Sequence, residues 1–104
     1  MDIEQTARCL AELGNITRLG IFRLLVRAGP EGLSIGELRN LQGIPASTLA
    51  FHLRGMVAVG LVIQQRSGRE VRCRPDYELL NQTLEFVKSE CCHGVTIPEQ
   101  RKTA

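Results

Sequence analysis

The sequence lacks several features that mark other classes of protein. It has no run of about 18 apolar residues, so we expect no membrane-spanning helix. It begins MDIEQTARC, with acidic residues and without the basic and apolar stretches of an export signal. A glycine-rich phosphate loop, an H-E-x-x-H motif and a nucleophile–base arrangement are missing, and there are only two histidines. These absences argue against an enzyme and favour a cytoplasmic protein without a membrane partner.

The length of the chain limits its organisation. With 104 residues we expect one domain, whose core is small enough that a shared dimer core is plausible. Without an export signal, the four cysteines are expected to be reduced thiols that serve in packing, metal binding or redox chemistry. We predict a folded domain over residues 1–94 and a flexible tail over 95–104, which has Pro98 and mixed charge.

Charge is distributed unevenly, although the formal net charge is only +2. The segment 54–74 has five arginines and one acid, Glu70, whereas 75–92 has four acids and one base, Lys88. Such asymmetry favours a polyanionic partner on one face. A solvated, arginine-rich hairpin without a partner would give the same pattern, so charge alone leaves both interpretations open.

Apolar periodicity and turn residues predict five helices and one hairpin. The expected helices cover 2–13, 17–28, 34–41, 45–59 and a segment from 77 whose apolar stripe reaches Cys91, with Gly94 as its C-cap. The strands are expected at 61–66 and 69–74, around Ser67-Gly68. The predicted fold is therefore mainly α with a small β-hairpin, in the order α-α-α-α-β-β-α.

The third and fourth helices have the spacing of a helix-turn-helix, and the hairpin after them would be a wing. In this motif the start of the second helix enters the major groove, where hydroxyls reach base edges or phosphates. Arginines further along the helix and on the wing would contact the backbone or a minor groove. We predict that double-stranded DNA is contacted by Ala46, Ser47, Thr48, Phe51, His52, Arg54, Arg66, Arg69 and Arg72.

Simpler interpretations exist for most of these residues. Ser47 and Thr48 are common at helix starts, and His52 would also fit as a partly buried structural residue. Phe51 would also fit against the wing, and the wing arginines would serve solubility alone. The ordered set favours DNA binding more strongly than any single member does.

Two segments resemble a known family. The run IPASTLAFHL at 44–53, with VGLV at 59–62, resembles the signature of the ArsR/SmtB family of winged-helix repressors. The run GNITRLGIF at 14–22 is similar to the start of that family's second helix, and the resemblance extends over about 5–94. It implies a homodimer formed through the first and last helices, and release of DNA when a metal or metalloid binds.

The resemblance also implies that Ser47, Thr48 and His52 lie at the DNA surface. The family often has serine before the position of Phe51, and this chain has Ala50 there. That difference removes a hydroxyl, so the base preference of the family is not transferred to this chain.

Adjacent cysteines, Cys91 and Cys92, follow the last apolar stripe. Neighbouring Cα atoms are about 3.8 Å apart, whereas disulfides usually need roughly 4.4–6.8 Å. Two thiols that bond each other poorly suit a thiophilic ion. Lys88 would favour a thiolate, while Glu90 and the helix C-terminus oppose it, so we expect no unusually reactive thiol before a ligand binds.

The resemblance directs attention to the same two cysteines. The family's Cys-x-Cys site on the third helix is absent, because 34–41 has no cysteine. Its zinc site needs histidines along the last helix, and none follows Asp76 at the needed spacing. The sequence CCHG at 91–94 instead resembles the arsenic-responsive branch, although no further cysteine follows in 95–104.

The ligand is predicted to be a trivalent arsenic or antimony species held by Cys91 and Cys92, with no organic cofactor. Arsenite would take three sulfurs, whereas methylarsenite needs only two, so the choice between them stays open. Cys9, water or a small thiol would complete a three-ligand site. Cys9 and Cys73 are more simply explained as packed residues, and His93 as an exposed one.

We therefore predict a homodimeric, metalloid-responsive repressor that leaves operator DNA when arsenite, methylarsenite or antimonite binds. The alternative is a thiol redox sensor of the same fold, in which Cys91 or Cys92 pairs across subunits or with Cys9. Peroxide would then release DNA as well as an arsenical does.

Overall fold

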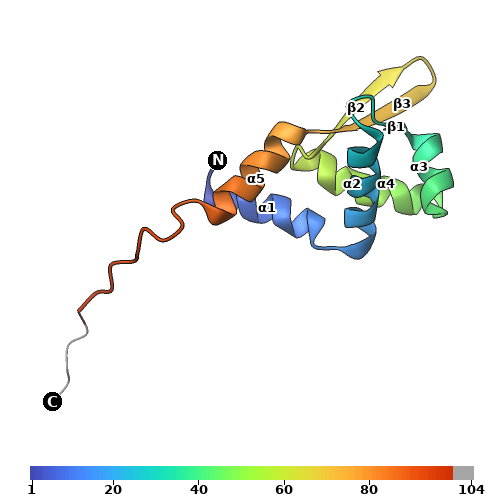
Figure 1. Ribbon diagram of the computed structural model, residues 1–104. Helices are drawn as coiled ribbons and strands as arrows, with labels where there is room; N and C mark the ends of the chain where they lie inside the picture. The colour runs from blue at the N-terminus through green and yellow to red at the C-terminus, as the bar shows by residue number, and fades with distance from the viewer. Residues whose placement is uncertain (100–104) are drawn as a thin grey trace.

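The computed structural model describes residues 1–99 and contains five helices and three strands within them. In chain order these are α1 (Ile3–Leu13), α2 (Ile16–Ala28), β1 (Leu33–Ser34), α3 (Ile35–Gln42), α4 (Ala46–Ala58), β2 (Val62–Ser67), β3 (Glu70–Pro75) and α5 (Tyr77–Lys88). Figure 1 shows α2, α3 and α4 grouped beside the sheet, with α1 and α5 next to each other at the opposite end. The predicted winged helix-turn-helix is confirmed. No helix in the described part of the chain is long and apolar enough to cross a membrane.

Side chains at the helix starts explain where the helices begin. Asp2 accepts a hydrogen bond from the backbone N–H of Gln5 at 2.7 Å, and Asn15 accepts one from the N–H of Arg18 at 3.0 Å. These are N-cap contacts, which satisfy amides that have no partner inside the helix. Ser34 and Glu37 form a capping box at the start of α3: the Glu37 N–H donates to Ser34 Oγ at 3.1 Å, and the Ser34 N–H donates to the Glu37 carboxylate at 2.8 Å.

A short strand, β1, was missed by the sequence analysis. It pairs antiparallel with β3, with Leu33 opposite Cys73, and gives the strand order β1-β3-β2. A two-residue strand has no alternation from which it could be predicted. Gly32, with φ of +66°, precedes it, and a Cβ there would collide with the carbonyl oxygen of Cys73. Glycine therefore allows the chain to approach β3.

The wing turn lies one residue later than predicted. Ser67 pairs with Glu70, so Gly68 and Arg69 form the two-residue loop. Gly68 has φ of +63°, which suits the first central position of a tight hairpin turn.

The core lies between the helices and the inner face of the sheet. Its buried members are Cys9, Ile21, Phe22, Leu25, Leu38, Leu49, Leu53, Met56, Leu61, Val62 and Cys73. The buried side of α4 consists of Leu49, Leu53 and Met56. Leu41, in the last turn of α3, continues the apolar spacing from Leu38 but is 59% exposed.

Helix α5 is shorter than predicted, because it ends at Lys88 instead of continuing past Cys91. Ser89 is the C-cap, and both its N–H and its hydroxyl donate to the carbonyl of Phe86, at 3.2 and 2.7 Å. The cysteines therefore lie on a turn beyond the helix. Residues 95–99 form no helix or strand, and the rest of the predicted tail, 100–104, lies outside the described residues.

Candidate DNA-binding surface and thiol site

The start of α4 is open to solvent. Ala46, Ser47 and Thr48 are all exposed, and Pro45 before them makes no side-chain cap. The first amides of the helix therefore lack an intrahelical or side-chain partner and face outward with a partial positive charge. Exposed hydroxyls beside such amides are the groups that a helix uses to contact phosphates and base edges.

Two rings lie next on α4. Phe51 is 58% exposed, and its ring centroid is 5.5 Å from that of His52 in an edge-on arrangement. His52 is half-buried, and its Nδ1 is buried with no hydrogen-bond partner in the described residues. Its position thus matches the partly buried interpretation as well as the DNA-facing one. Arg54, two residues further along the helix, is exposed.

The wing presents two arginines freely. Arg66 lies near the end of β2 and Arg69 in the turn, and both are exposed. Neither makes an ion pair with another described residue. Both are therefore available to a negatively charged partner.

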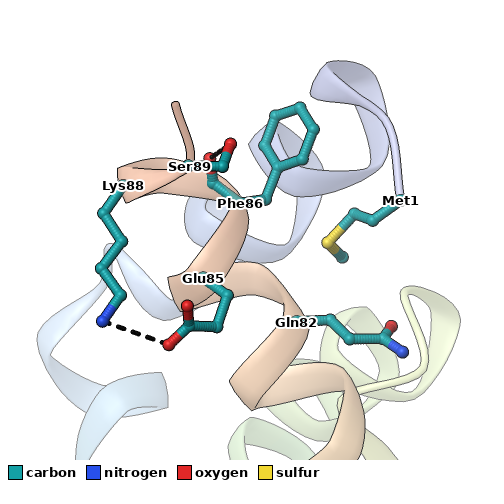
Figure 2. Close-up of a pocket in the computed structure, with 6 residues that line it drawn as sticks. All are labelled: Met1, Gln82, Glu85, Phe86, Lys88 and Ser89. Carbon is teal, nitrogen blue, oxygen red and sulfur yellow. Dashed lines mark hydrogen bonds and ion pairs between the residues drawn. The ribbon is translucent and has the colours of Figure 1, made fainter. Parts of the chain in front are cut away.

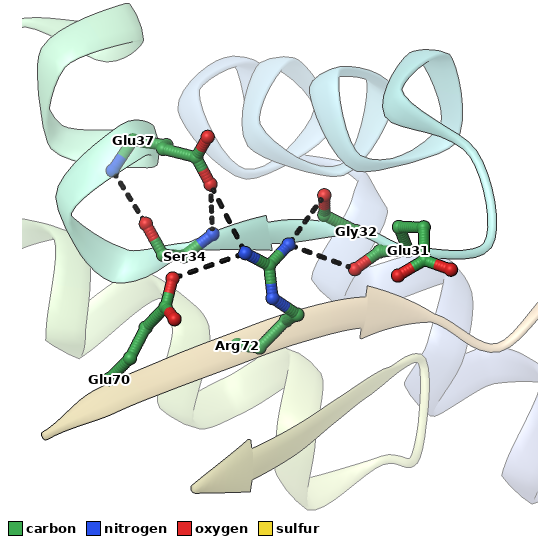
Figure 3. A network of polar contacts seen from close by, with 6 residues as sticks. All are labelled: Glu31, Gly32, Ser34, Glu37, Glu70 and Arg72. Carbon is green, nitrogen blue, oxygen red and sulfur yellow. Dashed lines mark hydrogen bonds and ion pairs between the residues drawn. The ribbon is translucent and has the colours of Figure 1, made fainter. Parts of the chain in front are cut away.

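Arg72 is placed differently from the other wing arginines (Figure 3). Its Nη1 donates to the backbone carbonyls of Glu31 and Gly32 at 3.2 and 3.3 Å. Its Nη2 lies 3.1 Å from the Glu70 carboxylate and 3.8 Å from that of Glu37. Hydrogen bonds from Ser34, first the backbone N–H and then the hydroxyl, lower the pKa of Glu37, and the charge of Arg72 adds to this.

These contacts tie the wing to the turn before α3. The guanidinium already points its donors at its own protein, so the position of Arg72 favours a structural role over the predicted DNA contact. Charge along a strand cannot distinguish a structural arginine from a DNA-binding one, because the carbonyls of Glu31 and Gly32 that Arg72 contacts lie 41 and 40 residues earlier in the chain.

Helices α1 and α5 pack against each other and leave an apolar surface uncovered. Four of their large apolar side chains are exposed, by 39–72%: Ile3, Leu10, Leu84 and Val87. Near the end of α5 a hollow of about 470 Å³ lies between Met1 and Phe86, with the Lys88–Glu85 ion pair of 3.1 Å at its rim (Figure 2). The sequence had suggested that Lys88 would favour a thiolate. In the structure Lys88 is instead paired with the Glu85 carboxylate.

Cys91 and Cys92 are exposed, free thiols whose sulfur atoms are 3.2 Å apart and share a hydrogen bond. Glu90 and Cys92 both adopt left-handed backbone conformations, with φ of +60° and +67°. Few residues other than glycine do so, and this turn brings neighbouring side chains to one side. The hydrogen bond with Cys92, and burial to a smaller extent, raise the pKa of Cys91. For Cys91 this agrees with the expectation that the thiol is not unusually reactive before a ligand binds.

The other two cysteines, Cys9 and Cys73, differ from Cys91 and Cys92 because they are buried. Cys9 is fully buried in α1, and Cys73 is fully buried in β3, where burial raises its pKa and a hydrogen bond from Gln64 partly opposes the shift. Within residues 1–99, no group of three or more His, Cys, Asp or Glu side chains is placed to hold a metal ion. His93 is exposed.

Comparison with known proteins agrees with the helix-turn-helix formed by α3 and α4. A model of the helix-turn-helix domain matches residues 13–65. The HTH-type transcriptional regulator YgaV of Escherichia coli K12 is 32% identical over 89 residues, which cover 86% of this chain and 88% of that protein. An ArsR-like transcriptional regulator from Rhodococcus sp. RHA1 superposes with a TM-score of 0.72 at 29% identity, over 82% of this chain and 77% of that one. The chain belongs to the ArsR family of winged helix-turn-helix transcriptional regulators.

Further solved structures have a similar fold. NolR from Sinorhizobium fredii has a TM-score of 0.66 at 27% identity, covering 82% of each chain. A winged helix-turn-helix domain from Mycobacterium bovis, itself described as homodimeric, has a TM-score of 0.65 at 22% identity, over 91% of this chain and 89% of that one. The predicted family and DNA-binding regulatory role, as opposed to an enzymatic one, are confirmed. The individual contact residues and the arsenical ligand stay predictions.

Proposed function

We propose that this ArsR-family regulator is a homodimeric repressor that releases operator DNA when a trivalent arsenic or antimony species binds Cys91 and Cys92. The proposal depends chiefly on two exposed thiols 3.2 Å apart at the end of the last helix of a DNA-binding fold. Reduced thiols are needed for this role, which fits the predicted cytoplasmic location.

The DNA contacts that we propose come from α4 and the wing. Hydroxyls and amides at the start of α4 would lie in the major groove, and the free arginines would contact phosphates. The proposed contact residues are Ala46, Ser47, Thr48, Phe51, His52, Arg54, Arg66 and Arg69. Arg72 is left out, because its Nη1 and Nη2 groups already bond to Glu31, Gly32 and Glu70.

The dimer that we propose buries the exposed apolar side chains of α1 and α5. Leu84 and Val87, 50% and 60% exposed, would be covered by a second copy of the chain. Two α4 helices would then face successive major grooves, which are about 34 Å apart along DNA. A change at the dimer face would alter this spacing.

The metalloid step is an exchange of ligands. Each thiol gives its proton to an oxygen on arsenic, an As–S bond replaces an As–O bond, and water leaves. Methylarsenite has two exchangeable oxygens and would be satisfied by Cys91 and Cys92. Arsenite would keep one oxygen or take a small thiol, since Cys9 is fully buried within α1. Soft thiolate ligands favour such ions over hard cations.

Binding would act on DNA through the end of α5. The thiols follow Lys88 by three and four residues, so a bridged ion would reshape the turn that adjoins the proposed dimer face. A coupling free energy of roughly 1–3 kcal/mol, or 5–150-fold in affinity, is typical of such switches.

Mass spectrometry of the reduced protein tests the ligand site. We expect one arsenic per chain after incubation with methylarsenite, and none for the Cys91→Ser/Cys92→Ser variant. A Cys9→Ser/Cys73→Ser variant is the matched control and should still form the adduct. If the native chain forms no adduct but peroxide links two chains through Cys91 or Cys92, the redox alternative replaces the metalloid proposal.

A further inference from the structure

Gly55 occupies an unusual position in the recognition helix α4. It lies in the helix interior, where glycine is less favourable than alanine, and its backbone is not in the left-handed region. A Cβ at this position would collide with the Glu12 carboxylate, with Glu12 Cδ only 2.8 Å away and Oε2 at 3.1 Å. The missing side chain therefore makes room for Glu12, which comes from α1.

Glu12 is held in place by Arg18 of α2. Arg18 Nε donates to the backbone carbonyl of Glu12 at 2.7 Å and lies 3.4 Å from its carboxylate oxygen Oε1. Both side chains are about three-quarters buried, with exposures of 21% and 24%. The carboxylate cannot move off Gly55 without weakening this ion pair, so three helices meet at one contact.

The contact lies beside the proposed DNA surface. A hollow of about 260 Å³ is lined by Glu12, Arg18 and Gly55 together with Phe51, Arg54 and Ala58. Phe51 and Arg54 are two of the proposed DNA contacts, and α1 is part of the proposed dimer face. The contact thus joins the helix that would dimerise to the helix that would read DNA.

We infer that Glu12 is a positioning residue, and that its carboxylate seated on Gly55 fixes the orientation of α4 relative to α1. This inference rests on the proposed function, because it needs DNA to be read by α4 within a dimer. Glu12 is acidic and is paired with Arg18, so it is not itself proposed as a contact to the phosphates of DNA. Its effect on DNA binding is exerted through the placement of α4.

Gly55→Ala, Glu12→Ala and the double variant test the inference in a double-mutant cycle. The probe is a labelled duplex that the native protein selects from a random-sequence pool, and affinity is measured by fluorescence anisotropy at several salt concentrations. We expect each single variant to bind DNA at least about fivefold more weakly, the lower end of typical coupling. Since no phosphate contact is lost, the salt dependence of binding should keep the native slope.

In the double variant the two losses should not add, because without the Glu12 carboxylate an alanine at 55 meets no obstacle. Gly36→Ala in α3 is the matched control, since a Cβ there has only Ser34 Oγ within 4 Å, at 3.9 Å. It should bind DNA as the native chain does. Sedimentation should show the native oligomeric state for every variant. Glu12→Gln, which keeps the shape but removes the charge, gives a second measurement if Gly55→Ala does not fold, and should also weaken binding.

The outcomes separate the two proposals. Native affinity in both Gly55→Ala and Glu12→Gln, or additive losses in the double variant, would overturn the role of Glu12 alone. A native protein that selects no duplex would overturn the proposed function and this inference with it.

Discussion

The sulfur atoms of Cys91 and Cys92 lie 3.2 Å apart on an exposed turn that begins directly after α5. Adjacent side chains in an extended chain point to opposite sides, so this approach depends on the left-handed backbone of Cys92, with φ of +67°. The turn therefore presents two thiols to one ligand without a rearrangement of the helices.

Alkylation with iodoacetamide should separate the four cysteines into two classes. Cys91 and Cys92 are exposed and should react quickly, whereas Cys9 and Cys73 are fully buried and should react only after unfolding. Mass spectrometry after a short pulse of reagent, with and without denaturant, gives the number of alkylated cysteines per chain. Rapid modification of Cys9 in the native protein would contradict its place in the core.

The pH dependence of that reaction tests the hydrogen bond. Because bonding to Cys92 raises the pKa of Cys91, its thiolate appears at higher pH than that of an ordinary cysteine. The alkylation rate of Cys91 should therefore rise at lower pH in the Cys92→Ala variant than in the native chain. Identical pH profiles for Cys91 in the two proteins would mean that the thiols do not interact.

Arg72 and Arg66 should respond differently to removal of their charge. Arg72→Met removes bonds to Glu31, Gly32 and Glu70, so the free energy of unfolding should fall by about 1 kcal/mol, since the side chain is one-third exposed. Arg66→Gln should leave unfolding unchanged and should lower the slope of log affinity against log salt by about one. Denaturant titration and DNA anisotropy give these two quantities. A lower salt slope with unchanged stability in Arg72→Met would restore Arg72 as a DNA contact.

Leu84 tests the dimer face. Leu84→Asp places a charge where we propose that a second copy packs, so the protein should sediment as a monomer and bind DNA weakly. Ile63→Asp is the control, because Ile63 is equally exposed, 49% against 50%, but lies on the wing. A Leu84→Asp protein that remains dimeric would place the interface elsewhere.

The sequence predicted the helices well where a capping residue and an apolar stripe coincide, as at Ser34 and along Leu49, Leu53 and Met56. The sequence was less informative where contacts between distant segments determine the local structure. The partners of Arg72 and the pairing of Leu33 with Cys73 join segments about 40 residues apart, which local patterns do not contain. The end of α5 was placed too late because Cys91 continues the apolar spacing, whereas the Ser89 cap stops the helix.

The candidate site was predictable in its residue types and less so in its geometry. Adjacent cysteines are visible in the sequence, but the left-handed turn that brings their sulfurs together is not. Gly55 gave a signal that sequence reasoning passed over, because an isolated glycine inside a helix often marks a close approach. Its partner Glu12 lies in another helix and became apparent only in the structure.

The most direct test of the account is release of DNA by a metalloid. Labelled duplex bound to the reduced native protein is titrated with methylarsenite and then, separately, with arsenite, beside Cys91→Ser/Cys92→Ser and Cys9→Ser/Cys73→Ser. The account predicts that anisotropy falls for the native chain and for the Cys9→Ser/Cys73→Ser variant, while the Cys91→Ser/Cys92→Ser variant stays bound. Undiminished DNA binding by the native protein at saturating concentrations of both ligands would contradict it.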